Sequence, residues 1–167
     1  MSLFNRRSLL LMPLAACLLA AACGFQPVYA PGGTGEALHG KVAVTEPNSV
    51  ESYLLVQNLE QRLGRDASAQ KLYDLDVKVA TATQSAAITT TNETNRYTIE
   101  GRAEFSLRSA ETGRILVSGN VHDFVGYSAA GSTVSTLADE RDATERLMII
   151  LSDQIVNRLY AAPGLTQ

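Results

Sequence analysis

The stretch from Arg96 to Arg108, RYTIEGRAEFSLR, alternates between two kinds of residue. One set is uncharged and mostly apolar, and comprises Tyr97, Ile99, Gly101, Ala103, Phe105 and Leu107; the other is polar or charged and includes Arg96, Thr98, Glu100, Arg102, Glu104 and Arg108. Successive side chains of a β-strand point to opposite faces of its sheet. The stretch therefore predicts a strand with one buried face and one solvated face.

The same alternation occurs on both sides of this stretch. Before it, Tyr73, Leu75, Val77 and Val79 alternate with Asp74, Asp76 and Lys78; after it, Ile115, Val117, Gly119 and Val121 alternate with Arg114, Ser118, Asn120 and His122. A threonine-rich stretch, residues 81–95, separates the first pair of segments, and Glu111-Thr112-Gly113 predicts a turn between the second pair. Three antiparallel strands in a meander are the simplest arrangement.

A short strand and a helix are predicted before this meander. Residues 41–45, KVAVT, are the strand candidate, and Pro47 closes it. We expect Asn48 to cap the helix, with Glu51 completing a start that resembles a capping box. The apolar face comprises Leu55, Val56, Leu59 and Leu63, and Gly64 supplies the expected stop.

A longer helix is predicted after a loop over residues 126–135. Thr136 can cap it, and acidic residues follow in its first turns, where they favour the helix dipole. Its core face comprises Thr144, Leu147, Met148, Leu151, Ile155 and Leu159, and Pro163-Gly164 ends it. Ile149, Ile150 and Val156 widen the apolar arc, so the helix either packs between two parts of this domain or contacts another protein.

These elements predict an α+β fold in the order β-α-β-β-β-α. Two amphipathic helices can cover one face of a four-stranded sheet while the other face stays polar. The first crossover should be right-handed, which makes the first strand parallel to a neighbour in a mixed sheet.

The N-terminus is predicted to be a lipoprotein signal peptide. Arg6 and Arg7 precede an apolar run from Leu9 to Cys23, which is shorter than the roughly 20 residues of a membrane-spanning helix. Cleavage before a cysteine that is then acylated is typical of bacterial lipoproteins. The residues before Cys17, Leu14-Ala15-Ala16, match the usual Leu-small-small-Cys pattern of lipoproteins better than those before Cys23. Cleavage before Cys17 would, however, leave an apolar h-region of only about seven residues. Cys23 is therefore the preferred lipidation site.

Removing residues 1–22, with their two arginines, changes the chain from 167 to 145 residues and its formal net charge from −3 to −5. The predicted organisation is a signal peptide at 1–22, a lipidated flexible tether at 23–40, an α/β domain at 41–162 and a C-terminal tail at 163–167. Glycine and proline in the tether disfavour any regular element there. Each acyl chain contributes roughly 0.8 kcal/mol per buried methylene, so two or three would hold the domain durably on a membrane.

Catalytic chemistry is not indicated by the sequence. The only histidines are His39, beside the tether, and His122, on the solvated side of a strand. Asp74 and Asp76 resemble a carboxylate pair but fit ordinary polar surface better. No zinc spacing, phosphate loop or dinucleotide motif occurs, so we expect neither a metal nor a cofactor and no enzyme activity.

Nucleic-acid binding is also disfavoured, because the predicted mature domain is acidic and its basic residues alternate with acids. The solvated face of the sheet combines Lys78, Arg96, Arg102 and Arg108 with Asp74, Asp76, Glu100 and Glu104. Such a face is either ordinary solvated surface or a surface for a hydrated partner or an anionic head group.

The sequence resembles the LPS-assembly lipoprotein LptE family. Cys23 is followed by Gly24-Phe25-Gln26-Pro27-Val28-Tyr29, close to the family's Cys-Gly-Phe-x-Pro-Leu-Tyr start, with Val28 in place of leucine and Ala20 in the signal. The stretches at residues 95–97, 111–116 and 138–143 are also similar to family patterns.

The resemblance implies a non-enzymatic lipoprotein of the outer membrane, facing the periplasm and anchored in the inner leaflet. Proteins of this family plug the LptD barrel, assist its assembly and help deliver lipopolysaccharide to the cell surface. Gly24 after the lipid cysteine, instead of aspartate, is typical of export to the outer membrane. Arg96, which opens a strand beside the hairpin, is the candidate lipopolysaccharide contact, and the alternative is an ordinary surface arginine. An auxiliary lipoprotein of a lipid-transport ABC system is the alternative.

Overall fold

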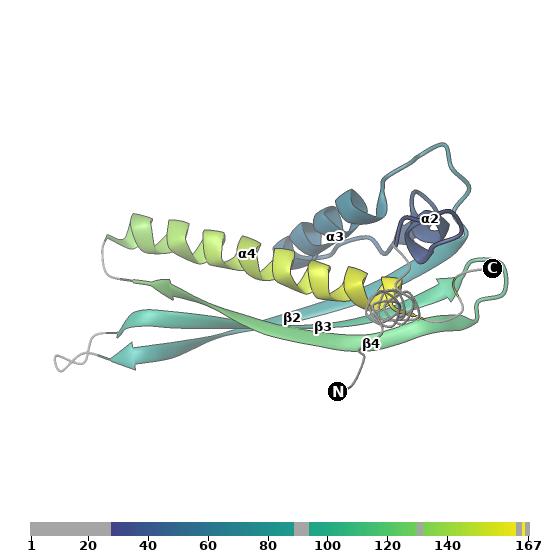
Figure 1. Ribbon diagram of the computed structural model, residues 1–167. Helices are drawn as coiled ribbons and strands as arrows, with labels where there is room; N and C mark the ends of the chain where they lie inside the picture. Colours follow the sequence, from purple (N-terminus) through teal and green to yellow (C-terminus); the bar gives the residue numbers. More distant parts are fainter. Residues whose placement is uncertain (1–27, 89–93, 130–131, 163–164, 166–167) are drawn as a thin grey trace, which may run out of the picture.

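The computed structural model describes residues 28–88, 94–129, 132–162 and 165 (Figure 1). The elements are α2 (Thr34–Leu38), β1 (Val42–Val44), α3 (Val50–Leu63), β2 (Tyr73–Ile88), β3 (Thr94–Ser109), β4 (Ile115–Ser128) and α4 (Thr133–Tyr160). The predicted signal peptide, Cys17 and Cys23 lie outside the described residues. No helix among the described residues is long and apolar enough to span a membrane.

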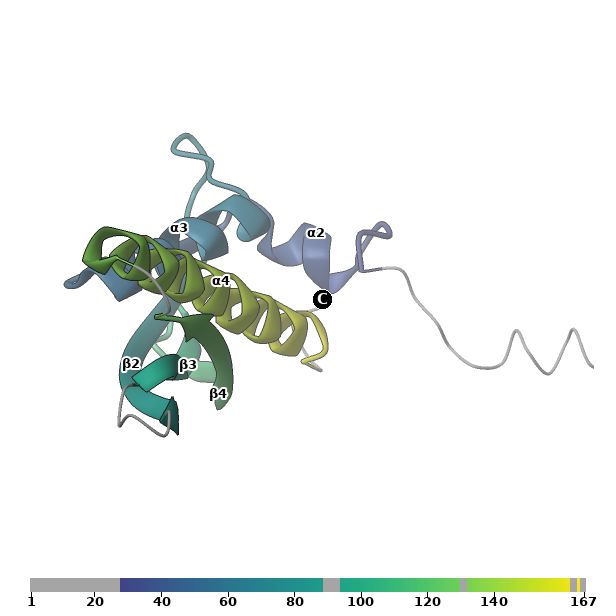
Figure 2. The same cartoon turned by 90° about the vertical axis from the view of Figure 1, so that its left-hand side faces the viewer.

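The four strands form one mixed sheet in the order β1-β2-β3-β4. β1 pairs parallel to β2, whereas the β2–β3 and β3–β4 pairs are antiparallel. Helices α3 and α4 lie on one face of this sheet (Figures 1 and 2). The predicted α+β fold, with two helices on one face of a four-stranded mixed sheet, is confirmed.

The core lies between this face and the helices. Leu75 and Leu107 are register partners on β2 and β3, and both are fully buried. The buried residues of α4 are Ala143, Leu147, Met148, Leu151, Ser152, Ile155, Val156 and Leu159. The predicted helix face is therefore confirmed except at Thr144, which is only half-buried. Val156 is buried within this domain, while Ile149 and Ile150 are half-buried.

The strands and α4 extend beyond their predicted bounds. β2 continues into the threonine-rich stretch as far as Ile88, and β4 continues to Ser128, into the predicted loop. Threonine is favoured in strands, and the long antiparallel register supplies backbone partners at these positions. α4 begins at Thr133 after an Ser132 cap, whose hydroxyl accepts the Ser135 amide at 3.3 Å, and not after Thr136.

The cap of α3 also differs from the prediction. Ser49, not Asn48, is the N-cap, and its hydroxyl accepts a hydrogen bond from the Ser52 amide at 3.1 Å. The Ser52 hydroxyl in turn accepts from the Ser49 amide at 2.8 Å, so Ser52 takes the place predicted for Glu51. The expected end at Gly64 is confirmed, with a positive φ of 79°.

The prediction that residues 23–40 contain no regular element is wrong for residues 34–38, which form α2. Leu38 of this helix is fully buried. Gly33 and Gly35 pack so closely on the Val28 carbonyl that a Cβ on either would lie 2.4 or 2.8 Å from its oxygen. The glycines that indicated a tether therefore permit close packing instead. Leu165, within the predicted tail, is also buried.

Candidate functional site

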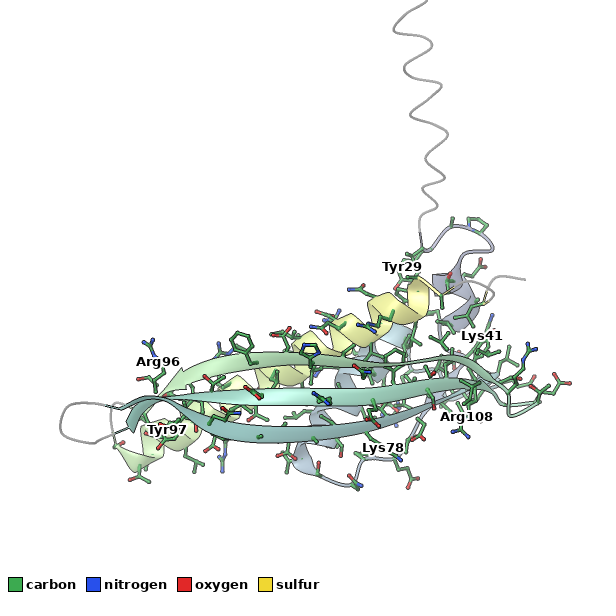
Figure 3. The ribbon with its side chains drawn as sticks, turned by 90° about the horizontal axis from the view of Figure 1, so that it is seen from below. Tyr29, Lys41, Lys78, Arg96, Tyr97 and Arg108 are labelled. Atoms are coloured by element: carbon green, nitrogen blue, oxygen red, sulfur yellow. The ribbon has the colours of Figure 1, made fainter. Side chains whose placement is uncertain are left out.

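The outer face of the sheet, opposite the helices, presents the polar residues of the alternating pattern (Figure 3). Register places Lys78 opposite Glu104, Asp74 opposite Arg108, and Arg102 beside His122. Their side chains are exposed. The alternation alone therefore assigned these residues to the correct face.

None of the ion pairs among the described residues involves a charged side chain of this outer face. Within the described ranges, the ion pairs are Arg62–Asp153, Arg65–Glu60 and Arg146–Asp142, all on or next to the helices. The face thus carries alternating positive and negative groups that remain in water. Solvated charges of both signs are suited to a polar, hydrated partner, because little internal bonding must be broken on contact.

Arg96 lies near the hairpin end of β3, and its side chain is exposed. Register places it beside Ser128 of β4 and near two irregularities in the pairing with β2. Arg108 lies at the other end of the sheet (Figure 3). Twelve residues of strand separate the two arginines by about 40 Å, so they cannot serve one small anionic group together.

Phe124 is a candidate contact that the sequence reasoning missed. Its side chain is 67% exposed on the outer face, where its register partner is Glu100. It borders a hollow of about 430 Å³ whose lining also includes Ala80, Ala82, Arg102 and His122. Extending the alternation of β4 from His122 to residue 124 would have placed this aromatic ring among the polar positions.

Asp123 explains how β4 holds Phe124 outward. The Asp123 carboxylate points to the helix side, where Gln154 of α4 donates a hydrogen bond to it at 2.7 Å. Its other oxygen accepts the Phe124 amide at 2.8 Å. Asp123 thus occupies a position that faces the helices, where the alternation predicts an apolar residue. Its hydrogen bond with Gln154 connects β4 to α4.

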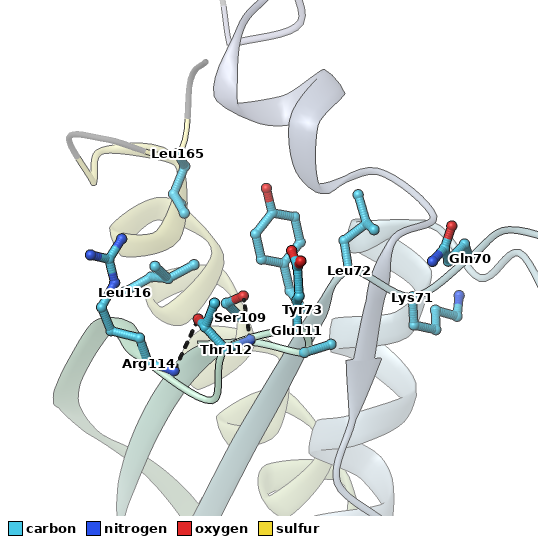
Figure 4. A pocket seen from close by; sticks show the side chains of 11 residues that line it. Gln70, Lys71, Leu72, Tyr73, Ser109, Glu111, Thr112, Arg114, Leu116 and Leu165 are labelled. Carbon is cyan, nitrogen blue, oxygen red and sulfur yellow. Dashed lines mark hydrogen bonds between the residues drawn. The ribbon is translucent and has the colours of Figure 1, made fainter.

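The larger cavity, about 840 Å³, lies at the other end of the sheet, beside the β3–β4 turn (Figure 4). Leu72, Tyr73, Leu116 and Leu165 contribute its apolar lining. Turn hydrogen bonds run from the Thr112 amide to Ser109 Oγ and from the Arg114 amide to Thr112 Oγ1, at 3.3 and 3.4 Å. Lys71, also in the lining, donates to two backbone carbonyls at 2.7 Å. The turn is therefore organised by its own hydrogen bonds.

The residues weighed for catalysis are not brought together. His122 is exposed on the outer face, as predicted, whereas the His39 ring packs against Gly64. Asp74 and Asp76 share the outer face, and Asp76 accepts a hydrogen bond from Thr45 at 3.2 Å. In the part of the chain that the structure describes, no group of three His, Cys, Asp or Glu residues could hold a metal ion.

Among the described residues, three ionisable groups have displaced pKa values. Burial raises the pKa of Tyr160 well above its usual value, and a hydrogen bond with Tyr29 adds to the effect. Burial likewise raises the pKa of Tyr127. Hydrogen bonds from Ser68 lower the pKa of the exposed Asp66 carboxyl. None of the three lies on the outer face.

The family comparison assigns this fold. A family model described as lipopolysaccharide-assembly, LptE, matches residues 41–159. The chain belongs to the LptE family. The predicted resemblance is confirmed, and the LptE match spans every strand and both long helices up to the last turn of α4. Among curated proteins, none matches this sequence significantly.

Solved structures share the LptE-like fold. A proposed lipoprotein from Caulobacter crescentus CB15 superposes with a TM-score of 0.64 at 18% identity, covering 76% of this chain and 92% of that one. The minor lipoprotein from Acinetobacter baumannii superposes with a TM-score of 0.56 at 15% identity, covering 74% of this chain and 92% of that one. Rare lipoprotein B from Shewanella oneidensis superposes with a TM-score of 0.53 at 11% identity, covering 70% of this chain and 89% of that one. At these identities the similarity shows the fold alone.

Proposed function

We propose that this LptE-family chain is an outer-membrane lipoprotein that plugs the LptD barrel, assists its assembly and takes part in lipopolysaccharide delivery to the cell surface. The family match over residues 41–159 carries this proposal. In it, Cys23 is acylated and attaches the protein to the inner leaflet of the outer membrane. The protein acts by binding and has no catalytic step.

The outer face supports a plug role on physical grounds. The interior of a large outer-membrane barrel is polar and hydrated. A domain that fills such an interior needs a surface that can form hydrogen bonds and ion pairs with it. The unpaired charges opposite the helices, such as Lys78 and Glu104, provide this surface. Phe124 adds an exposed aromatic ring to this face, the kind of residue that anchors an interface.

Recovery of the barrel with the tagged, full-length protein tests the proposal. After mild detergent extraction, LptD should co-purify, and depletion of the protein should leave LptD misassembled. Recovery of an inner-membrane lipid transporter in place of LptD would support the ABC-system alternative. Normal maturation of LptD in depleted cells would exclude the assembly role.

A pair of variants tests the outer face specifically. Phe124→Asp places a carboxylate on this face, whereas Val134→Asp places one on α4, where the side chain is 80% exposed. Neither residue is buried, so both variants should fold. We expect Phe124→Asp to reduce the LptD recovered and Val134→Asp to leave it unchanged. Equal recovery from both variants would remove the outer face from the proposal.

Direct lipopolysaccharide contact by Arg96 is a separate part of the proposal. Its exposed guanidinium can pair with a phosphate of the glycolipid, since arginine forms bidentate, charge-assisted hydrogen bonds with phosphate. Arg96→Glu should weaken binding of purified lipopolysaccharide. The matched variant Arg141→Glu changes an exposed arginine of α4 and should not. If the two variants bind alike, the charge at residue 96 has no specific role.

Mass spectrometry of the mature N-terminus tests the anchor. We expect a chain that begins at Cys23 and carries acyl groups. A mature chain that begins at Cys17 would move the attachment point six residues upstream, and an unmodified N-terminus would exclude lipid anchoring.

A further inference from the structure

The segment from Val28 to Leu38 is folded onto the domain. The Gly35 amide donates to the Val28 carbonyl at 2.9 Å, and the Gly33 amide donates to the Ala30 carbonyl at 2.7 Å. The Gly32 amide donates to the Glu36 carboxylate at 2.7 Å. With Leu38 fully buried, these bonds make residues 28–38 part of the domain.

A contact between two tyrosines joins this segment to the end of α4. The hydroxyl oxygens of Tyr29 and Tyr160 are 3.0 Å apart, and the rings meet edge to face with centroids 5.9 Å apart. Burial and this hydrogen bond raise the pKa of Tyr160, so its hydroxyl stays protonated at neutral pH. We call this contact the tyrosine clasp. It lies at the end of the molecule opposite Arg96 (Figure 3).

The clasp changes the length of chain between the lipid and the domain. From Cys23 to Val28 there are five residues, which span at most about 18 Å. A flexible tether reaching to Lys41 would have eighteen residues and a reach of about 60 Å. The folding of residues 28–38 onto the domain, to which the clasp contributes, thus shortens the maximum reach of the chain from about 60 to about 18 Å.

We propose that the tyrosine clasp holds the C-terminal end of α4 against the phospholipid surface, an inference that rests on the proposed acylation of Cys23. Tyr29 is 64% exposed and Val28 is 37% exposed, so an aromatic and an aliphatic side chain face the lipid. Tyrosine favours such interfaces, where its ring meets apolar groups and its hydroxyl stays hydrated. α4 spans about 42 Å, so its first residues and the hairpin end can extend away from the membrane.

Two positions on α4 measure this orientation. Asn157 and Asp139 are both exposed, and eighteen residues, or five helical turns, place them on the same side of the helix about 27 Å apart. A cysteine at either position is labelled with a donor dye in the acylated protein. Vesicles of phosphatidylethanolamine and phosphatidylglycerol carry the acceptor on a small fraction of their lipids. We expect greater energy transfer from position 157 than from position 139.

Breaking the clasp should remove most of this difference. Tyr29→Ala should lower transfer at position 157, because it removes the contact with Tyr160 and lets the chain between Cys23 and the buried Leu38 lengthen. Tyr160→Phe keeps the ring and removes one hydroxyl, and should cause a smaller loss in the same direction. Tyr53→Ala is the control, because Tyr53 is an exposed tyrosine of α3 outside the clasp, and it should change neither position. Equal transfer from the two positions in the unmodified protein, or no loss with Tyr29→Ala, would overturn the inference.

A second readout separates this inference from the proposed function. If Cys23 carries no lipid, the protein will not float with the vesicles, and the proposed attachment fails. Amide exchange at Gly35, which donates to Val28, still reports the clasp in the unlipidated chain. Tyr29→Ala should accelerate that exchange and Tyr53→Ala should not. Unchanged exchange at Gly35 would refute the clasp even where the anchor is present.

Discussion

The two halves of β2 share one alternating pattern but are packed differently. In the covered half, residues 73–79, Leu75 is fully buried and β1 pairs with residues 73–75. In the hairpin half, residues 81–88, every side chain from Thr81 to Ser85 is exposed. The positions that face the helices change accordingly, from Tyr73, Leu75, Val77 and Val79 to Thr81 and Thr83.

Helix length explains the difference. α3 has 14 residues and is about 21 Å long, whereas the 16 residues of β2 extend about 54 Å. α4 is longer but packs over β3 and β4. The far half of β2 is therefore left without a cover, and threonine keeps a strand there without exposing apolar surface. A change from valine to threonine at alternate positions indicates where a covering helix ends.

Shortening one side chain in each half should give the largest contrast. Leu75→Ala removes buried contacts with β3 and should lower the free energy of unfolding by about 2–5 kcal/mol. Thr83 lies on the same face of β2 but in the uncovered half, so Thr83→Ala should change the free energy of unfolding by less than about 0.5 kcal/mol. Urea unfolding followed by circular dichroism measures both. Similar losses would mean that the hairpin half is covered in solution.

Adding one carbon at two glycines sharpens the comparison, because Gly101 of β3 is buried against α4 even though its register partner, Thr81 of β2, is exposed. A Cβ at Gly101 would lie 2.9 Å from Leu147 and 3.0 Å from Leu151, two fully buried side chains of α4. Gly101→Ala should therefore cost about 1–3 kcal/mol through overpacking. Gly126→Ala is the control, since its nearest contact is an ordinary 3.6 Å. Thermal melts should separate the two, and an unchanged melting temperature for Gly101→Ala would contradict close packing of α4 there.

The ion pair between Arg62 and Asp153 should have a smaller effect, because both side chains are partly exposed. It joins α3, which covers β2, to α4. A double-mutant cycle with Arg62→Ala and Asp153→Ala should give a coupling of about 0.2–1 kcal/mol. The coupling should fall in 1 M salt, where the screening length is about 3 Å. A coupling that is independent of salt would indicate a contact other than an ion pair.

The smallest effect is expected in the loop that leads into the covered half. Ser68 donates hydrogen bonds to Asp66 from its hydroxyl and its amide, at 2.6 and 2.8 Å, and lowers the pKa of that carboxyl. Because the folded pKa is lowered, the stabilisation is present above the ordinary value of 3.8 and is lost as pH falls through the folded pKa. Ser68→Ala should raise the pKa of Asp66 in an NMR titration. Ser109→Ala, in the β3–β4 turn, should leave it unchanged.

Much of the candidate site followed from the alternation of single strands. It placed Lys78, Arg102 and Arg108 on the outer face because side-chain direction in a strand is a local property. Phe124 was missed because the predicted strand ended before it. Where β4 ends depends on its pairing with β3, which a local pattern does not contain.

The tether shows the limit of local reasoning most clearly. Gly33 and Gly35 predicted flexible chain because glycine lowers the propensity for regular structure. In the folded protein the same residues lie where any side chain would collide with the Val28 carbonyl. The same segment is joined to the rest of the domain by the buried Leu38 and by the contact of Tyr29 with Tyr160, which lies far away in the sequence. Because glycine has no side chain, Gly33 and Gly35 can approach the Val28 carbonyl closely. The propensity of a residue for regular structure does not indicate such a close approach.

By itself, the sequence determined the type and order of the long elements, the two faces of the sheet and the family, because periodicity and short motifs are local. Tertiary structure alone decided which half of β2 is covered, how far the strands run and how residues 28–38 join the domain. These features depend on contacts between distant segments. Their free energies arise from burial and from hydrogen bonds that form only once the helices lie on the sheet.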